Sequence, residues 1–283
     1  MKILGIGRSP RFSPNSVDRD GAIFSAVASR MLRGGNDVSV INEDLFIAVD
    51  LSEFDLVFSM ARGRDVLTDL AEAETQQGLC VVNSAQALLA ATRHELVVSL
   101  KEAGIPQPTT QVLTLSTESI PEVPASLKFP LWLKRGDACA QKAGDVRYLA
   151  TANEWEEALA HFQSQNVKQV IAVAHAEGDL VKFYGVEGTD FFFHTYPTDK
   201  GNYSKFGLEE HNGAPQHFAF DLEQLKRTAD QAARTTGFTI YGGDAIVRKD
   251  GSFLFIDFND WPSFSACRKE AAKAIAQRLK AMG

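Results

Sequence analysis

The residues Tyr241–Asn259 read YGGDAIVRKDGSFLFIDFN, two apolar runs separated by Asp250-Gly251. An Asp-Gly dipeptide between two apolar runs predicts a β-hairpin with a two-residue turn. Lys249 and Ser252 would then form the first pair beyond the turn, and the pairing of every other hairpin residue follows by counting outward. The stretch therefore predicts two long antiparallel strands in the last part of the chain.

Two acidic side chains face each other in this predicted hairpin. Counting from the turn places Asp244 directly opposite Asp257, so the two carboxylates share a face with Cβ atoms about 5 Å apart. Asn259 lies two residues beyond Asp257 and points to the same side. Like-charged carboxylates repel unless a cation or a proton lies between them. Because carboxylate and amide oxygens suit magnesium, Asp244, Asp257 and Asn259 are predicted to form a metal site.

The alternative is a surface hairpin whose acidic face is merely solvated. Counting from the same turn places Ile246, Phe253 and Phe255 on the acidic face. A strand face that carries such side chains is expected to be covered by other parts of the protein. The metal site is therefore the favoured interpretation.

The first ninety residues alternate between short apolar runs and helical patterns. One helical pattern has Ile23, Val27 and Met31 on one face and ends at Gly34-Gly35. Short apolar strands separated by helices predict a parallel sheet with right-handed crossovers, and thus an α/β domain over residues 1–90. The apolar runs are Ile3-Leu4, Val38–Ile41, Leu56–Met60 and Leu79–Val82.

A break in regular structure is predicted at Ile105–Pro108, because each proline restricts the residue before it. Further strand and helix patterns follow this break. We divide the chain after residue 90 into two lobes, residues 91–172 and 173–283, with the boundary between Ala172 and Val173. The predicted fold class is α/β, with an N-terminal parallel-sheet domain followed by two α+β lobes.

The chain has 283 residues, with 29 Lys and Arg against 36 Asp and Glu, a formal net charge of −7. A net acidic chain is a poor candidate for non-specific nucleic-acid binding. Cys80, Cys139 and Cys267 are too few and too scattered for a disulfide framework or a zinc site, which indicates reduced thiols in the cytoplasm. No apolar run approaches the roughly 18 residues of a membrane span. The six histidines show no ligand spacing and are expected to be surface or packed residues.

In its last lobe the chain resembles the ATP-grasp superfamily. The signature of that superfamily is an aspartate on one strand and an acid-x-Asn motif on the next, here Asp244, Asp257 and Asn259, which together hold one or two magnesium ions. Ala103–Thr109 resembles the passage into the ATP-grasp region, and Phe129–Lys134 is similar to the strand that bears an ATP-phosphate lysine. The resemblance extends over nearly the whole chain and implies an ATP-grasp fold whose two later lobes clamp ATP.

The resemblance also implies the residues of an ATP site. Lys134 and Lys182 would hold phosphates as point charges, and Arg93 stands where the family usually has a lysine. The alternative is that both lysines snorkel to solvent from strand ends. The glycine-rich lid of the family is reduced here to Arg135–Gly144, and Glu177 begins the segment that bears the second lysine. Backbone groups of a hinge would meet the adenine edge, and the hinge residues are Val170, Ile171, Ala172 and Val173.

A second substrate is expected beside the nucleotide. Ligands of an open parallel sheet bind beyond the carboxyl ends of its strands, and the loops after the first and third strands are rich in arginine. Helix N-termini also favour anions, and Arg268 near the start of the last helix is the candidate catalytic residue. These features predict a small anionic acceptor, unless the arginines pair with surface acids instead. The candidate acceptor-binding residues are Arg8, Arg11, Arg62, Arg64, Ser263 and Ser265.

Taken as a whole, the sequence predicts a cytoplasmic enzyme that uses Mg-ATP, with no nucleic-acid or membrane partner and with a homodimer allowed. The favoured reaction is a carboxylate–amine ligation through an acylphosphate. Asp257 stands where such ligases mostly have glutamate, and together with Trp261-Pro262 it is closer to ATP-grasp inositol polyphosphate kinases. A kinase of a polyol phosphate is therefore the first alternative. The reduced lid leaves a nucleotide-binding protein without turnover as the second.

Overall fold

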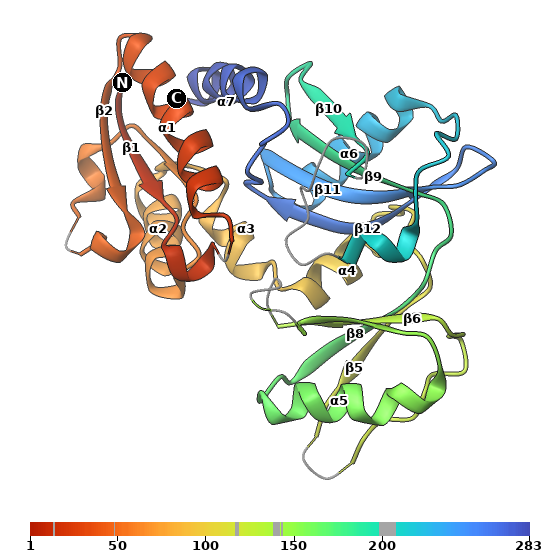
Figure 1. The fold of residues 1–283 in the computed structure, drawn as a ribbon. Helices are drawn as coiled ribbons and strands as arrows, with labels where there is room; N and C mark the ends of the chain where they lie inside the picture. Colours follow the sequence, from red (N-terminus) through yellow and green to blue (C-terminus); the bar gives the residue numbers. More distant parts are fainter. Residues whose placement is uncertain (14, 48, 117–118, 138–141, 143, 198–207) are drawn as a thin grey trace.

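The computed structural model describes the whole chain except residues 14, 48, 117–118, 138–141, 143 and 198–207. Its strands form three four-stranded sheets that follow one another along the chain (Figure 1). The predicted α/β class is confirmed, because the first sheet is parallel and the other two are antiparallel with helices packed on them. Within the described ranges no helix combines the length and the apolar character that a membrane span needs. The middle of the lid segment expected at Arg135–Gly144, with Cys139, lies outside the described residues.

The N-terminal sheet forms where short buried strands alternate with amphipathic helices. Its elements are β1 Lys2–Gly7, α1 Val17–Arg33, β2 Asp37–Asn42, β3 Leu56–Ser59, α2 Arg64–Gln77, β4 Cys80–Val82 and α3 Ala85–Ala90. The strands run parallel in the order β2-β1-β3-β4, as the alternation predicted. The predicted apolar face of α1 is confirmed, since Ile23, Val27 and Met31 are buried. The carboxyl ends of β1 and β3 lead into the loops that carry Arg8 and Arg62.

The central sheet has a core of its own. Its elements are α4 Arg93–Glu102, β5 Thr110–Thr114, β6 Leu131–Arg135, β7 Val146–Leu149, α5 Trp155–Ser164 and β8 Gln169–Ala174. The antiparallel order is β5-β8-β6-β7, so β8 is paired on both sides. α5 packs Leu159 and Phe162 against Leu131 and Leu133 of β6. Thr92 caps α4 in a capping box with Glu95.

The C-terminal sheet contains the predicted hairpin. Its elements are β9 Asp179–Val186, β10 Phe192–Thr195, the short helix η5 Leu208–Asn212, α6 Leu222–Thr236, β11 Ile240–Val247, β12 Phe253–Asp260 and α7 Arg268–Met282. The antiparallel order is β10-β9-β11-β12. α6 buries Leu225 and Ala229 in a core with Phe183 and Tyr241 of the sheet. This packing leaves the opposite face of β9, β11 and β12 turned toward the central sheet (Figure 1).

The N-terminal and C-terminal sheets belong to one continuous body. α7 packs beside α1, and its Ile275 shares a core with Ile3 of β1 (Figure 1). The buried side chain of Asn83 joins the two sheets further. Its Nδ2 donates to the carbonyl oxygen of Ile240 at 2.8 Å, and its Oδ1 accepts from the Ile240 N–H at 2.7 Å. Asn83 thus pairs with the first residue of β11 much as a neighbouring strand would.

The hairpin turn differs from the two-residue turn that Asp250-Gly251 predicts. Val247 pairs with Phe253, and the backbone N–H of Arg248 donates to the carbonyl oxygen of Ser252 at 2.8 Å. The loop therefore contains one residue more than predicted, and Gly251 takes the left-handed conformation at φ 82°. A left-handed glycine at the end of a three-residue loop is a common way to close a hairpin.

A β-bulge in β12 compensates for this longer turn. Asp244 pairs with Asp257, whereas the next residue, Ala245, pairs with Phe255, so Ile256 is an extra residue in β12. The predicted opposition of the two aspartates is thereby confirmed. The expectation that Phe253 and Phe255 share their face is wrong, because the bulge turns these two rings into the core beside α6, away from Ile246.

Candidate active site

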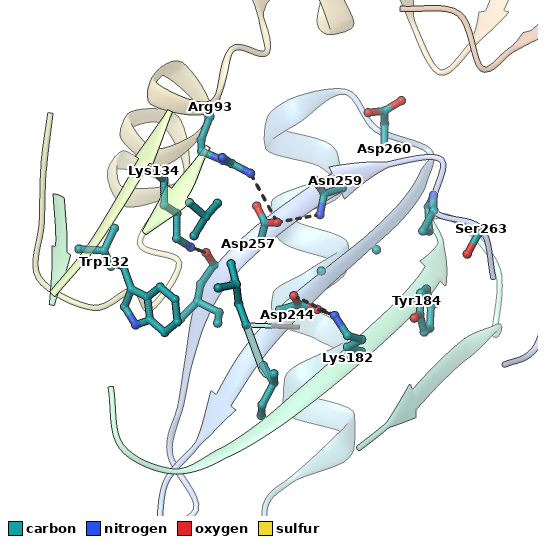
Figure 2. Close-up of a pocket in the computed structure, with 18 of the residues that line it drawn as sticks. Arg93, Trp132, Lys134, Lys182, Tyr184, Asp244, Asp257, Asn259, Asp260 and Ser263 are labelled. Carbon is teal, nitrogen blue, oxygen red and sulfur yellow. Dashed lines mark hydrogen bonds and ion pairs between the residues drawn. The ribbon is translucent and has the colours of Figure 1, made fainter. Parts of the chain in front are cut away.

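A cavity of about 340 Å³ lies between the central and C-terminal sheets and extends to the loops of the N-terminal sheet. We call it the main cavity. Figure 2 shows that side chains from α4, β6, β9, β11 and β12 point toward one another there. One part of its wall is charged, and another part is formed by aromatic and aliphatic side chains. This division suits a ligand that has both a charged and an apolar portion.

Asp257 lies on the charged side of the main cavity. Its Oδ2 is 3.9 Å from Nη2 of Arg93 and accepts a hydrogen bond from Nδ2 of Asn259 at 3.2 Å. Burial raises the pKa of Asp257, but the Arg93 guanidinium, the Lys134 ammonium and the Asn259 amide outweigh burial and hold the pKa below its usual value. The carboxylate is therefore ionised at neutral pH.

Asp244 is paired across the sheet with a lysine. It is in register with Asp257 on β12 and with Lys182 on β9. Nζ of Lys182 lies 3.3 Å from both carboxylate oxygens of Asp244 (Figure 2). The side chains of Lys182 and Asp244 are 14% and 25% exposed, so neither is a freely solvated surface group. Lys182 therefore faces the main cavity and does not snorkel out of it.

Lys134 connects the central sheet to the bulge of β12. Its Nζ donates to the backbone carbonyl oxygen of Ile256, the extra residue of the bulge, at 2.7 Å. Burial lowers the pKa of Lys134, and the nearby carboxylate of Asp257 opposes that shift. Because Lys134 lines the main cavity and donates to a carbonyl oxygen, its other N–H groups could donate to a bound anion.

The oxygen donors of this region fit a hard divalent cation. Asp244 and Asp257 oppose each other directly, and Asn259 keeps its Oδ1 for a ligand while its Nδ2 bonds Asp257. The described ranges contain no group of three or more His, Cys, Asp or Glu side chains placed to hold a metal, so a metal here would need the amide of Asn259. Lys182 and Arg93 offset the repulsion between the two carboxylates in this structure, so the cation that their opposition requires is in part supplied by side chains.

The expected hinge residues lie within the ladder of β8. Val170, Ile171, Ala172 and Val173 pair with β5 on one side and β6 on the other, so their backbone groups are not available to an adenine edge. Val173 still lines the main cavity with its side chain. Glu177 is exposed and lines a neighbouring groove instead. The interpretation of this stretch as a backbone hinge for adenine is therefore corrected.

Arg8 and Arg62 reach the main cavity from the N-terminal sheet, as the topology predicts, but each is paired with an acid. Nη1 of Arg8 donates to Asp20 at 3.0 Å, and its other nitrogens donate to the backbone carbonyls of Met60 at 3.1 Å and Trp261 at 3.3 Å. Arg62 forms an ion pair with the buried Asp260. The positive charges of Arg8 and Arg62 at the acceptor end of the cavity are thus offset by carboxylates.

The other acceptor candidates do not all converge on the cavity. Arg11 is exposed, and its Nη2 lies 3.7 Å from Oδ1 of Asp44. It therefore pairs with a surface acid, which was the alternative to acceptor binding. Arg64 is exposed at the start of α2, outside the main cavity. Ser263 lines the cavity, and its Oγ is 3.0 Å from Oγ of Ser265.

The candidate catalytic residue lies behind this loop. Arg268 is the first residue of α7 and does not line the main cavity. Its Nε is buried without a hydrogen-bond partner among the residues that the structure describes. A direct catalytic contact from Arg268 is therefore not supported by its position.

Four aromatic side chains that the sequence analysis did not select gather at the other end of the cavity. Trp132 of β6, Tyr148 of β7, His175 and His211 of η5 form a cluster in which the rings of Tyr148 and His211 stack with centroids 4.1 Å apart. His175 is packed against Trp132 and Tyr148, as expected of the histidines, and it also lines the main cavity. One available signal was Trp132, which lies two residues before Lys134 and so on the same strand face.

Glu43 is a second group that the sequence analysis missed. This buried carboxylate follows β2 and accepts hydrogen bonds from the backbone N–H groups of Ser9 at 2.5 Å, Arg62 at 2.8 Å and Gly63 at 2.7 Å. It therefore holds together the loops that follow β1 and β3. No pattern in the sequence distinguishes this acid from those on the surface.

Comparison with known proteins gives matches in structure alone. No protein-family model and no curated protein sequence matches the chain. Two crystal structures of D-alanine–D-alanine ligase from Bacillus anthracis, one of them complexed with ATP, have TM-scores of 0.64 and 0.65 at 13% identity. Each comparison covers 100% of this chain and 95% of the ligase.

An ATP-grasp protein with a RimK domain from Sphaerobacter thermophilus DSM 20745 is similar to the same degree. Its TM-score is 0.65 at 17% identity, and the comparison covers 98% of this chain and 99% of that protein. Likeness over nearly the full length of all these chains shows a shared overall fold.

Proposed function

We propose that this chain, which has the ATP-grasp fold, is an Mg-ATP-dependent carboxylate–amine ligase. The observation that carries the proposal is the composition of the main cavity. Oxygen ligands for magnesium (Asp244, Asp257 and Asn259) lie beside cationic groups for phosphates (Lys134 and Lys182), in a cavity that also has an apolar end. The ATP complex of the D-alanine–D-alanine ligase supports a nucleotide as the occupant.

The residues would act by positioning and by neutralising charge. Asp244, Asp257 and Asn259 would hold magnesium, which when bound offsets the negative charge of the phosphates. Lys134 and Lys182 would each supply a charge-assisted hydrogen bond to a phosphate oxygen. Lys182 would exchange its contact with Asp244 for this phosphate contact. Such an arrangement favours phosphoryl transfer without a covalent enzyme intermediate.

The acceptor would lie near Arg62, on the side of the cavity that faces the N-terminal sheet. The side chain of Arg62 is 24% exposed, whereas that of Arg8 is 9% exposed and bonds three protein groups. Arg62 is therefore the guanidinium within reach of a small carboxylate, and Arg8 is the one that supports the loop. ATP would phosphorylate this carboxylate, and an amine would then displace phosphate from the acylphosphate.

Trapping with hydroxylamine tests this reaction. The protein would be incubated with Mg-ATP, hydroxylamine and a panel of small amino acids, hydroxy acids and dicarboxylic acids. A ligase is expected to release ADP and form a hydroxamate with at least one acid, and the Asp257→Asn protein should form none. ADP release without any hydroxamate would contradict the acylphosphate.

A polyol-phosphate kinase is the second candidate, because Asp257 takes the place of the glutamate usual in the ligases. Incubation with inositol phosphates and Mg-ATP would then give a stable phosphate ester that phosphorus NMR detects. Nucleotide binding with no ADP release from any acceptor would favour a protein without turnover.

A further inference from the structure

The base of the aromatic cluster is a hydrogen bond between Trp132 and His175. Nε1 of Trp132 donates to Nδ1 of His175 at 3.1 Å. An indole N–H can only donate, so Nδ1 must act as the acceptor. A neutral imidazole with an accepting Nδ1 carries its proton on Nε2. The contact with Trp132 therefore selects one tautomer of His175, with an N–H donor at Nε2.

His175 is also neutral at neutral pH. Burial lowers its pKa from 6.5, the nearby Glu177 carboxylate opposes this shift, and His211 adds to it. Protonation would moreover place a second N–H against the indole N–H of Trp132. Geometry and charge thus agree on the Nε2–H form.

The donor at Nε2 has no protein partner within the described part of the chain. Backbone donors nearby are already used: the N–H of Ala174 donates to Thr109 at 2.9 Å, and that of His175 donates to Pro130 at 3.1 Å. The preceding residues of β8 are held in the ladder on both sides. The side chain of His175 is consequently a donor, beside the backbone N–H of Ala176, where β8 leaves the sheet.

The walls of the main cavity beside His175 suit a flat apolar ring. Ala176, Leu180 and Ile246 form a small apolar cluster that lines the main cavity, and Val173 and Trp132 border the same end. The phosphate-binding candidates Lys134 and Lys182 lie on the charged side (Figure 2). A nucleotide whose phosphates occupy the charged side would place its base among these apolar side chains.

We propose that His175 recognises the base of the nucleotide by donating a hydrogen bond from Nε2 to a purine ring nitrogen, and that Trp132 positions His175 by holding its tautomer. This inference rests on the proposed use of ATP in the main cavity. It adds a side-chain donor at the point where the backbone of β8 itself is occupied by the ladder.

Calorimetric binding to the full-length protein tests the proposal. The ligands are Mg-ATP and three ATP analogues in which N1, N3 or N7 is replaced by CH. The wild-type protein is expected to bind one of these analogues about 3- to 10-fold more weakly than ATP, the effect of losing one hydrogen bond. The His175→Phe protein should bind ATP more weakly than the wild type by the same factor. It should also bind that analogue and ATP with equal affinity.

Two further variants separate recognition from packing. Gln in His175→Gln can accept from Trp132 and still donate, so it should restore most of the discrimination that Phe removes. Trp132→Phe keeps an aromatic ring but removes the hydrogen bond that selects the tautomer of His175. The difference in affinity between ATP and the analogue should therefore become smaller without disappearing. His194→Phe is the matched control, because His194 is a half-buried histidine outside the main cavity and should leave all affinities unchanged.

Three results would overturn the proposal. One is a His175→Phe protein that still distinguishes the three analogues as the wild type does. Another is equal wild-type affinity for ATP and all three analogues. The third is a loss that follows removal of a ribose hydroxyl in deoxy-ATP, which would assign His175 to the sugar. A wild-type protein that binds no ATP would instead refute the proposed function itself.

Discussion

Nζ of Lys182 is equidistant from the two carboxylate oxygens of Asp244, at 3.3 Å from each, and the two residues are direct neighbours on β9 and β11. The lysine is a phosphate-binding candidate and the aspartate is a metal-ligand candidate. Each therefore holds the other in place of the ligand that it would bind. Entry of a metal and a phosphate would separate the pair and give both charges new partners.

Removing the lysine should therefore have opposite effects on the two ligands. In Lys182→Met the carboxylate of Asp244 loses its ammonium partner, so Mn²⁺ in the absence of nucleotide should bind more tightly. ATP should bind more weakly by about 1.5–3 kcal/mol, the value of a charge-assisted hydrogen bond. Calorimetry with each ligand measures both. Lys249→Met, an exposed lysine of the hairpin turn, is the control, and equal weakening of both ligands would contradict the exchange.

Loss of the Asp257 charge should abolish metal-dependent turnover and leave the fold intact. Asp257→Asn keeps the shape and removes an anionic ligand, and several kcal/mol of charge stabilisation corresponds to a rate loss of about 100-fold or more. ADP release at a series of magnesium concentrations measures this. Asp250→Asn, at the tip of the same hairpin, should retain full activity. Wild-type magnesium dependence in Asp257→Asn would exclude Asp257 as a ligand.

Lys134 should contribute to nucleotide affinity and not to the fold of the central lobe. Lys134→Met keeps the aliphatic stem and should weaken ATP binding by about 1.5–3 kcal/mol. The exposed Lys128, in the loop before the same strand, provides the control Lys128→Met. Unchanged ATP affinity in Lys134→Met would show that Lys134 does not bind the nucleotide and only forms its hydrogen bond to the Ile256 carbonyl oxygen.

The Asn83 contact should be a large contribution to stability. Asn83→Ala leaves the Ile240 N–H without its acceptor, whereas the Ile240 carbonyl oxygen still accepts from the Trp261 N–H at 3.1 Å, and one unpaired buried group costs about 1–3 kcal/mol. The free energy of unfolding in urea should therefore fall by about 1–3 kcal/mol. Gln86→Ala, which changes an exposed amide, should change it by less than about 0.5 kcal/mol. Equal effects of the two substitutions would show that Asn83 does not join the sheets.

The stability of the protein should decrease in mild acid through His194. Burial lowers the pKa of His194 from 6.5, so below that pH the unfolded chain binds a proton that the folded chain does not. The free energy of unfolding must then fall as pH decreases. His194→Phe should make the pH profile flatter between about pH 7 and pH 5.5. An unchanged slope in the variant would show that His194 titrates normally in the folded protein.

The periodicity of the sequence was sufficient for the parallel sheet, and counting from the predicted turn gave the correct opposition of Asp244 and Asp257. The turn was not predictable in the same way. Its extra residue and the bulge at Ile256 shift the register in opposite directions, so the acids meet although the predicted turn is wrong. The backbone N–H of Phe255 donates to the carbonyl oxygen of Pro106 at 2.7 Å, a tertiary contact beside the bulge that no local pattern reveals.

Charge pairing and backbone availability were beyond the reach of sequence patterns. The predicted topology correctly placed Arg8 and Arg62 at one edge of the sheet. Their acidic partners could not be predicted, because Asp20 lies in α1 and Asp260 is the last residue of β12 in another sheet. Likewise, the backbone groups of β8 cannot bind a base because β8 lies between β5 and β6 in its sheet. The sequence of one strand does not reveal the order of the strands.

The shared core of the first and last sheets means that the central lobe is, in effect, an insertion into a single cooperative unit. Opening the central sheet and α5 relative to that unit would break the Lys134–Ile256 contact, whereas α4, whose Leu100 belongs to the large apolar core, would stay with the unit. The rigid part carries Asp244 and Asp257, and the inserted part carries Lys134. A nucleotide that bridges these residues would therefore add a further link between the two parts of the protein.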